Sequence, residues 1–178
     1  MNFILLDTSV LIKMKGIPQT CEAVNSLLDR HTSSTIFVPH IVYYELLRQC
    51  SDKNDYSKSK KVLSQYKKFV LTVKIIEFAT YYYNVLINFK QQNGQMCISK
   101  TQLSDIDIFM GASAMISNAM VCTTNRADFP SPFFDESDKQ ALPGTEKIYL
   151  LQADKPLLCQ ELEKIFTRLE PDCAKHPF

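Results

Sequence analysis

Acidic side chains stand beside apolar stretches at three places in the sequence. Asp7 comes directly after the apolar run of residues 3–6, and Glu45 is the only carboxylate in a long apolar segment. Asp105 and Asp107 precede a run of apolar and small residues. A carboxylate in such surroundings is costly unless it is paired, hydrogen-bonded or bound to a metal. Because Mg²⁺ and Mn²⁺ prefer oxygen ligands, these acids are candidate ligands of a divalent cation that activates water against a phosphodiester.

Each acid also has a simpler explanation that depends only on its neighbours. Glu45 could form an ion pair with Arg48, one helical turn further on. Ser104 and Asp107 fit a helix capping box, and acids in a first turn suit the helix dipole. For each residue alone these alternatives stay open, whereas the set together favours a metal site.

The elements that must position these acids are predicted from the spacing of apolar residues. The predicted strands are Phe3–Leu6, Thr35–Val38, Ala119–Thr123 and Ile148–Leu151. The predicted helices are a short one after Asp7 capped by Thr8 or Ser9, then Cys21–Leu28, a buried His40–Gln49, Phe78–Phe89, Asp105–Ser117 and Pro156–Leu169. Strands that alternate with helices predict one α/β domain over residues 1–178, with a mostly parallel central sheet flanked by helices.

Two polar segments are predicted to lie outside this core. The turn-rich stretch Pro130–Lys147 is expected to be a surface loop. The lysine-rich stretch from Ser51 to Lys61 is expected to be a loop or the start of an exposed helix. In an open parallel sheet, ligands bind beyond the carboxyl ends of the strands. This rule brings Asp7 and the segment that holds Glu45 to one edge, together with residues 123–128.

Composition limits the class of protein and its partners. The chain has 178 residues and a net charge of +1, so binding of nucleic acid would depend on local patches. Basic residues with interleaved tyrosines could line a phosphate track, although a solvated helix face is the simpler interpretation; they are Arg48, Lys58, Lys60 and Lys61, with Lys53, Lys67, Lys68, Tyr56 and Tyr66 near them. The six cysteines lack metal-ligand spacing and are expected to be reduced, and without a signal peptide or apolar span a cytoplasmic location is expected.

Four blocks in this order resemble the PIN domain family, and within it the small ribonucleases of the VapC toxin type. The blocks, between residues 3 and 129, are FILLDTSVLI, VPHIVYYELLR, SDIDIFMGASAM and VCTTNRADF. The resemblance implies an endoribonuclease that uses Mg²⁺ or Mn²⁺. It implies Asp7, Glu45 and Asp107 as metal ligands, Asp105 as an additional acid, Asn125 or Asp128 in the fourth position, and Ser9 and Thr123 as supporting hydroxyls.

If the resemblance to the toxins is complete, it also implies a small antitoxin protein as partner and a homodimer. The lysine-rich segment and the long stretch Pro130–Lys147 depart from the small toxins and make that role less secure than the nuclease role. The alternative is a catalytically idle PIN-like scaffold that binds protein or RNA. For that scaffold, Tyr81–Tyr83 could form a pairing surface, although their spacing with neighbouring apolar residues is more typical of core.

Overall fold

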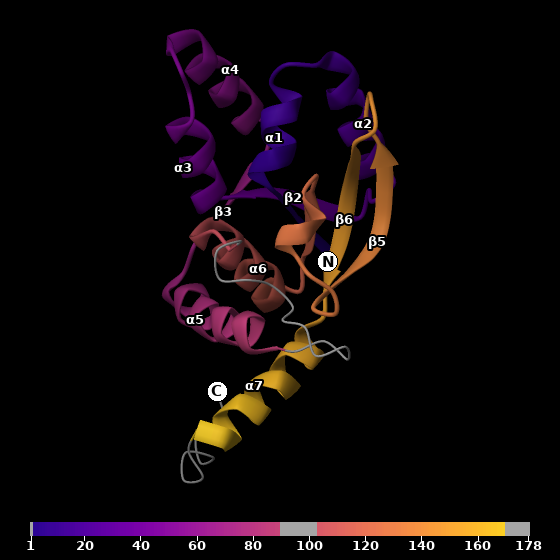
Figure 1. Cartoon of the computed structure of the whole chain (residues 1–178). Coiled ribbons are helices and arrows are strands. Elements are labelled where there is room, and N and C mark those ends of the chain that lie inside the picture. The colour runs from indigo at the N-terminus through magenta and orange to yellow at the C-terminus, as the bar shows by residue number, and fades with distance from the viewer. Residues whose placement is uncertain (1, 90–102, 170–178) are drawn as a thin grey trace.

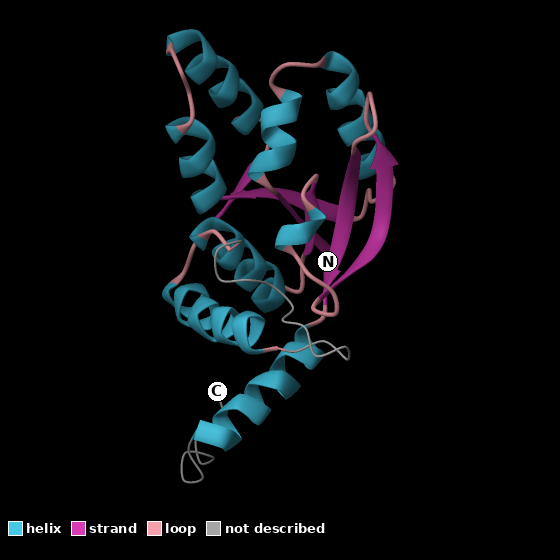
Figure 2. Cartoon of the chain, viewed as in Figure 1, coloured by secondary structure: helices cyan, strands magenta, loops and turns pink. Residues whose placement is uncertain are grey.

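A six-stranded sheet lies at the centre of the protein, with helices on both sides (Figure 1; Figure 2). The computed structural model describes residues 2–89 and 103–169. The strands are β1 (Asn2–Leu6), β2 (Ser34–Pro39), β3 (Lys67–Phe69), β4 (Met120–Thr123), β5 (Phe134–Ala141) and β6 (Lys147–Ala153). Their order in the sheet is β3-β2-β1-β4-β6-β5. Strands β3, β2, β1 and β4 run parallel to one another, and β6 runs antiparallel to both of its neighbours, β4 and β5. The expected α/β class with a mostly parallel sheet is therefore confirmed.

Seven α-helices and one 3-10 turn connect these strands in the described residues. They are α1 (Thr8–Met14), α2 (Pro18–Asp29), α3 (His40–Arg48), α4 (Lys53–Leu63), α5 (Val73–Asn88), α6 (Asp105–Ser117), the turn η1 (Arg126–Asp128) and α7 (Lys155–Leu169). In the view of Figure 2, α1 to α4 lie above the central strands, α5 and α6 lie below them, and α7 extends away at the bottom. None of the described helices has the length and apolar character needed to cross a membrane.

The carboxyl ends of β1 and β4 meet at one edge of the sheet. Ile4, Leu5 and Leu6 have no exposed surface, because β1 lies between β2 and β4 and is covered on both faces. The pairing aligns Leu6 with Cys122, and the Asp7 amide donates to the Cys122 carbonyl at 3.0 Å. This register places the residues that follow the two strands side by side.

The start of α1 differs from its prediction. The cap is Asp7, whose side chain accepts from the Thr8 amide, and not Thr8 or Ser9. Sequence alone does not separate three consecutive capping residues; the end of the strand decides among them, since β1 stops at Leu6 and the helix begins two residues later. The same carboxylate therefore caps a helix and faces the edge of the sheet.

The stretch Pro130–Lys147 is not a loop, so this prediction was wrong. Its middle part, Phe134–Ala141, is β5, which pairs with β6 to form an antiparallel hairpin at the edge of the sheet. Only Phe134 is fully buried in β5, and the other positions carry mainly polar and charged side chains. An edge strand with so little apolar alternation resembles a loop in sequence, whereas its partner strand supplies the hydrogen bonds that define it.

Helix α3 buries less of its surface than predicted, whereas α5 agrees with its core interpretation. In α3 only Val42 and Leu46 are fully buried, whereas Ile41, Tyr43 and Leu47 are partly buried against the core and Tyr44 is exposed. In α5, Tyr82 is buried and Tyr83 packs against the core, which agrees with the core interpretation of the three tyrosines. The lysine-rich segment forms α4, as the exposed-helix expectation allowed.

Four cysteines are free thiols, and Cys97 and Cys173 lie outside the described residues.

Candidate functional site

Asp7 is held at the end of β1 by three hydrogen bonds. Its Oδ1 accepts from the Thr8 amide at 2.7 Å, and its Oδ2 accepts from Ser9 Oγ at 2.6 Å and from Thr123 Oγ1 at 2.8 Å. The residue is 4% exposed. A buried carboxylate with this many donors is fixed in orientation. The two hydroxyl residues expected to support the site therefore both contact Asp7.

Glu45 is directed to the same edge from the second half of α3. Thr8 Oγ1 donates to its Oε2, and Gln49 Nε2 donates to its Oε1 at 3.1 Å. The alternative ion pair with Arg48 is not formed, because the Arg48 guanidinium lies over the Tyr44 ring, 5.4 Å from its centroid. Thr8 therefore bonds both acids, because its amide donates to Asp7 and its hydroxyl donates to Glu45.

Asp107 reaches the site from the first turn of α6. Its amide donates to Ser104 Oγ at 3.2 Å, and the Ser104 hydroxyl donates to Asp107 Oδ2 at 2.5 Å, so Ser104 is the cap that was predicted. Burial raises the pKa of Asp107 to about 6, and the charges of Asp7 and Glu45 add to this rise against the opposing bond from Ser104. Asp107 is therefore a capping-box residue that also lies in the field of two other acids.

Asp128 supplies a fourth carboxylate from the 3-10 turn that follows β4. Its pKa is raised to about 7 by burial first, and then by the charges of Asp107 and Asp7, with a smaller contribution from Glu45. Asn125 is exposed, and its side-chain amide donates to Asp128 Oδ2 at 2.7 Å. Of the two residues considered for the fourth position, Asp128 lies in the field of the other acids and Asn125 holds it.

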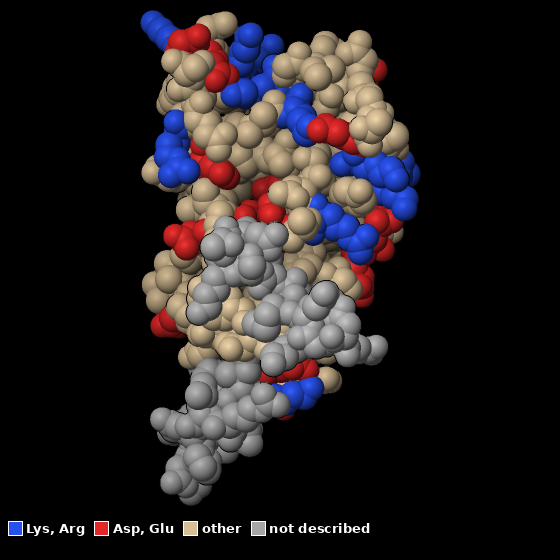
Figure 3. Space-filling view, viewed as in Figure 1, with Lys and Arg blue, Asp and Glu red and all other residues tan. Residues whose placement is uncertain are grey.

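We call Asp7, Glu45, Asp107 and Asp128 the acid cluster. Asp105 is exposed and is not among the charges that chiefly raise the pKa values of this cluster. A recess near the centre of Figure 3 shows acidic side chains between α3 and α6. In the described part of the chain, no three acidic, histidine or cysteine side chains lie close enough together to share one ion. Each carboxylate of the cluster accepts instead from its own hydroxyl or amide donor.

The chemistry of these donors fits a hard divalent cation. The cluster offers carboxylate oxygens from four separate elements, and Mg²⁺ or Mn²⁺ is typically held by one or two carboxylates together with waters and substrate phosphates. Carboxylates that repel one another at short range favour protonation or a bound cation. To share one ion, the carboxylates would have to rotate toward one another. Glu45, Asp107 and Asp128 are half-buried, and only Asp7 is fully buried, so the side chains that would rotate are the half-buried ones.

The raised pKa of Asp128 predicts how the metal-free protein responds to pH. Between about pH 4 and pH 7 the folded state binds more protons at this group than the unfolded state, so this contribution to stability falls as the pH rises. In EDTA at about pH 8, Asp128→Asn should therefore raise the free energy of unfolding by about 1 kcal/mol, less than the full shift implies because solvent screens part of the repulsion. At about pH 5 the gain should shrink, as denaturant melts would show.

Asp29→Asn is the matched control, since Asp29 is an exposed carboxylate on α2. It should change the free energy of unfolding little at either pH. Addition of Mg²⁺ should stabilise the wild type more than Asp128→Asn. An Asp128→Asn protein that is less stable than wild type in EDTA at pH 8 contradicts the mutual repulsion.

Some contributors to the site were not singled out in the sequence. Thr8 was considered only as a helix cap, and its hydroxyl bonds Glu45; Gln49 bonds the same carboxylate. The signal for Gln49 was its four-residue spacing from Glu45 on one helix. Of the basic residues, Lys58 and Lys61 lie exposed on α4, whereas Lys60 donates to Tyr43 OH at 3.0 Å.

The parallel sheet and the acids near its carboxyl edge agree with the expected PIN domain. The family model of the PIN domain matches residues 4–131, and the chain belongs to this family. The matched region contains the four blocks on which the resemblance rested, except Phe3 at the start of the first, and it ends before the β5–β6 hairpin.

Two solved structures share the fold. VapBC2 from Rickettsia felis, bound to a DNA fragment from its promoter, is 18% identical with a TM-score of 0.52 and covers 71% of this chain and 90% of its own. A toxin–antitoxin complex from Klebsiella pneumoniae is 16% identical with a TM-score of 0.51 and covers 72% of this chain and 92% of its own. A comparison with curated protein sequences found no match.

Proposed function

We propose that the protein is a metal-dependent endoribonuclease, in which Asp7, Glu45, Asp107 and Asp128 hold Mg²⁺ or Mn²⁺. The observation that carries this proposal is the gathering of four acids at the carboxyl edge of the sheet, where burial and then the charges of neighbouring acids raise the pKa of Asp107 to about 6 and that of Asp128 to about 7. Structural ion pairs would lower these pKa values, whereas a cluster of like charges that has no basic partner among the described residues suits a cation site.

The residues of the chain have separate tasks in this proposal. Ser9 and Thr123 fix the orientation of Asp7, and Thr8 does the same for Glu45. A divalent cation bound there supplies a Lewis acid that orients the phosphodiester and activates the attacking water. The exposed Asp105, in the first turn of α6, adds negative charge at the rim of the site.

We further propose that the protein is the toxin of a toxin–antitoxin pair. The support is the likeness of fold to toxin–antitoxin complexes from two bacteria, together with membership of the PIN domain family. A cognate antitoxin would then bind this chain and cover the acid cluster. The active form would be a homodimer in the cytoplasm.

Cleavage of a mixed pool of labelled RNAs tests the enzymatic proposal. Purified protein, freed of any partner and checked for folding, would be assayed with Mg²⁺, with Mn²⁺ and with EDTA. We expect cleavage with either metal and none with EDTA. A folded protein that cuts no RNA under any metal would overturn the proposal and favour the idle scaffold.

The fourth position of the site gives a separate prediction. Asp128→Asn should lower metal-dependent cleavage more than about 100-fold, because it removes a ligand charge. Asn125→Ala should lower it only about 10-fold, because it removes a hydrogen bond that positions Asp128. Initial rates at saturating Mg²⁺ measure both effects. The reverse order of the two losses would show that Asn125, and not Asp128, fills the fourth position.

A further inference from the structure

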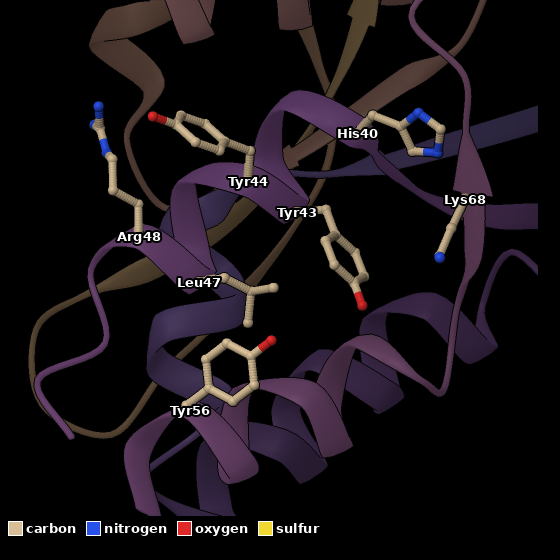
Figure 4. A pocket seen from close by; sticks show the side chains of 7 residues that line it. All are labelled: His40, Tyr43, Tyr44, Leu47, Arg48, Tyr56 and Lys68. Atoms are coloured by element: carbon tan, nitrogen blue, oxygen red, sulfur yellow. The ribbon is translucent and has the colours of Figure 1, made fainter. Parts of the chain in front are cut away.

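A groove of aromatic and basic side chains lies along α3 and extends toward α4 and β3 (Figure 4). Its volume is about 540 Å³. The lining includes three tyrosines, Tyr43, Tyr44 and Tyr56, and two cations, Arg48 and Lys68. None of the described residues that line it is a carboxylate. In size it matches pockets that hold small organic ligands, with room for about one nucleotide.

The cations of the groove lie directly against the tyrosine rings. Lys68 Nζ is 4.9 Å from the Tyr43 ring centroid, and Arg48 Cζ is 5.4 Å from that of Tyr44. Lys60 Nζ is 5.5 Å from the Tyr43 centroid and also donates to its hydroxyl. Positive charge and aromatic faces are therefore presented together, which is the combination that binds backbone and bases of a single-stranded nucleic acid.

Much of this aromatic surface is open to solvent. Tyr44 is 56% exposed and Tyr56 is 44% exposed, and neither belongs to the hydrophobic core. Figure 4 shows Tyr43, Leu47 and Tyr56 converging between α3 and α4, whereas Tyr44 projects from another side of α3 beside Arg48. A flat ligand can therefore reach the ring of Tyr44 without displacing core residues.

The groove adjoins the acid cluster through α3. Tyr44 precedes Glu45 directly, and Arg48 follows it by three residues. Residues three apart on a helix are surface neighbours, and successive residues are about 100° apart around the axis. A strand whose phosphodiester lies at Glu45 would therefore continue over Tyr44 and Arg48 within about one helical turn.

We infer that this groove binds the single-stranded RNA that continues from the cleavage position, with a base stacked on Tyr44 and phosphates near Arg48 and Lys68. The inference rests on the proposed function and adds the surface of this chain that would hold the RNA next to the cleavage position, namely the groove along α3. A duplex keeps its bases stacked on one another, so it does not offer a base to an exposed ring. The lack of carboxylates in the lining favours this anionic occupant over a basic protein segment.

Binding of RNA in EDTA tests the inference separately from catalysis, because binding is then measured without cleavage. The probe is a labelled single-stranded RNA of about ten nucleotides, compared with its duplex, and the readout is fluorescence anisotropy. Tyr44→Ala should weaken single-strand binding about 10-fold, whereas Tyr44→Phe should keep it, because the ring and not the hydroxyl stacks. Arg48→Ala should weaken binding. It should also reduce the slope of log binding constant against log salt concentration by about one, as expected for the loss of one phosphate contact.

Lys74→Ala is the charge-matched control, since Lys74 is an exposed lysine on α5. It should bind like wild type, and circular dichroism would verify that all variants are folded. The inference is overturned by wild-type affinity in Tyr44→Ala and Arg48→Ala, by a preference for duplex, or by a wild type that binds no RNA in EDTA. Wild-type affinity in both variants would favour a protein partner as the occupant of the groove.

The two proposals fail in different ways. RNA that binds in the groove but is never cut with Mg²⁺ or Mn²⁺ would overturn the nuclease proposal and keep the groove assignment. Metal-dependent cleavage with unchanged affinity and rate in Tyr44→Ala and Arg48→Ala would keep the nuclease and remove the groove from its substrate path.

Discussion

Asp7→Asn should reduce metal-dependent RNA cleavage more than about 100-fold and leave the fold intact. The loss follows from the charge, because substitutions of groups that only support a metal ligand already cost 10- to 100-fold and Asp7 is a proposed ligand itself. The fold should survive because Asn keeps the size of Asp and can still accept from the Thr8 amide. The hydroxyls of Ser9 and Thr123 can accept from the new amide as readily as they donated to the carboxylate.

Cleavage rates at several Mg²⁺ concentrations, with thermal melts of both proteins, check this prediction. Asp29→Asn, an exposed acid on α2, serves as the matched control and should cut like wild type. A melting temperature close to that of wild type would show that the loss concerns the site. If Asp7→Asn kept more than about a tenth of the activity with the same metal dependence, the acid cluster would not be the catalytic site.

Gly111→Ala should destabilise the protein, because the added methyl group has no room beside Tyr82. A Cβ at Gly111 would lie 2.4 Å from Tyr82 Cε1 and 2.8 Å from two further atoms of that side chain. Tyr82 is 1% exposed, so its ring has no free space into which it can move. Overpacking of this kind costs about 2 kcal/mol even after the better helix propensity of alanine. The melting temperature should fall by about 5 °C.

A comparison with Gly16→Ala isolates the cause, because nothing lies within 4 Å of a Cβ at Gly16. That variant should melt within about 2 °C of wild type. In a Tyr82→Leu background the added methyl has room, so Gly111→Ala should cost much less there than in wild type. Equal costs in the two backgrounds would mean that the contact between α5 and α6 does not limit residue 111.

The parallel half of the fold could be predicted well from sequence because its signals are local. β1 is apolar at each position except its first because it is covered on both faces, and α6 begins and ends at the residues that its Ser104 cap and apolar spacing indicate. Strand β6 was also indicated by its apolar run, but its hairpin partner β5 could not be predicted in this way. β5 has eight residues with one fully buried side chain, and its strand conformation depends on hydrogen bonds to β6.

The same division holds for the candidate site. Type and position predict Asp7, Glu45 and the pair Asp105 and Asp107 as candidates, because an acid beside an apolar run needs a special reason, and the family resemblance favours Asp107 within the pair. Their hydrogen-bond partners were only partly foreseen. The contact from Thr8 to Glu45 joins residues 37 positions apart, and the contact from Thr123 to Asp7 joins residues 116 apart.

The sequence by itself determined the α/β class, the family and the candidate acids. The spacing of apolar residues, the helix caps and the four blocks each depend only on residues close together in the chain. Only the tertiary structure decided that Asp128 lies in the field of the other acids and that Asn125 holds it. It also decided that Arg48 covers Tyr44 instead of pairing with Glu45. These outcomes depend on burial and on distances between elements far apart in the chain, which local patterns do not contain.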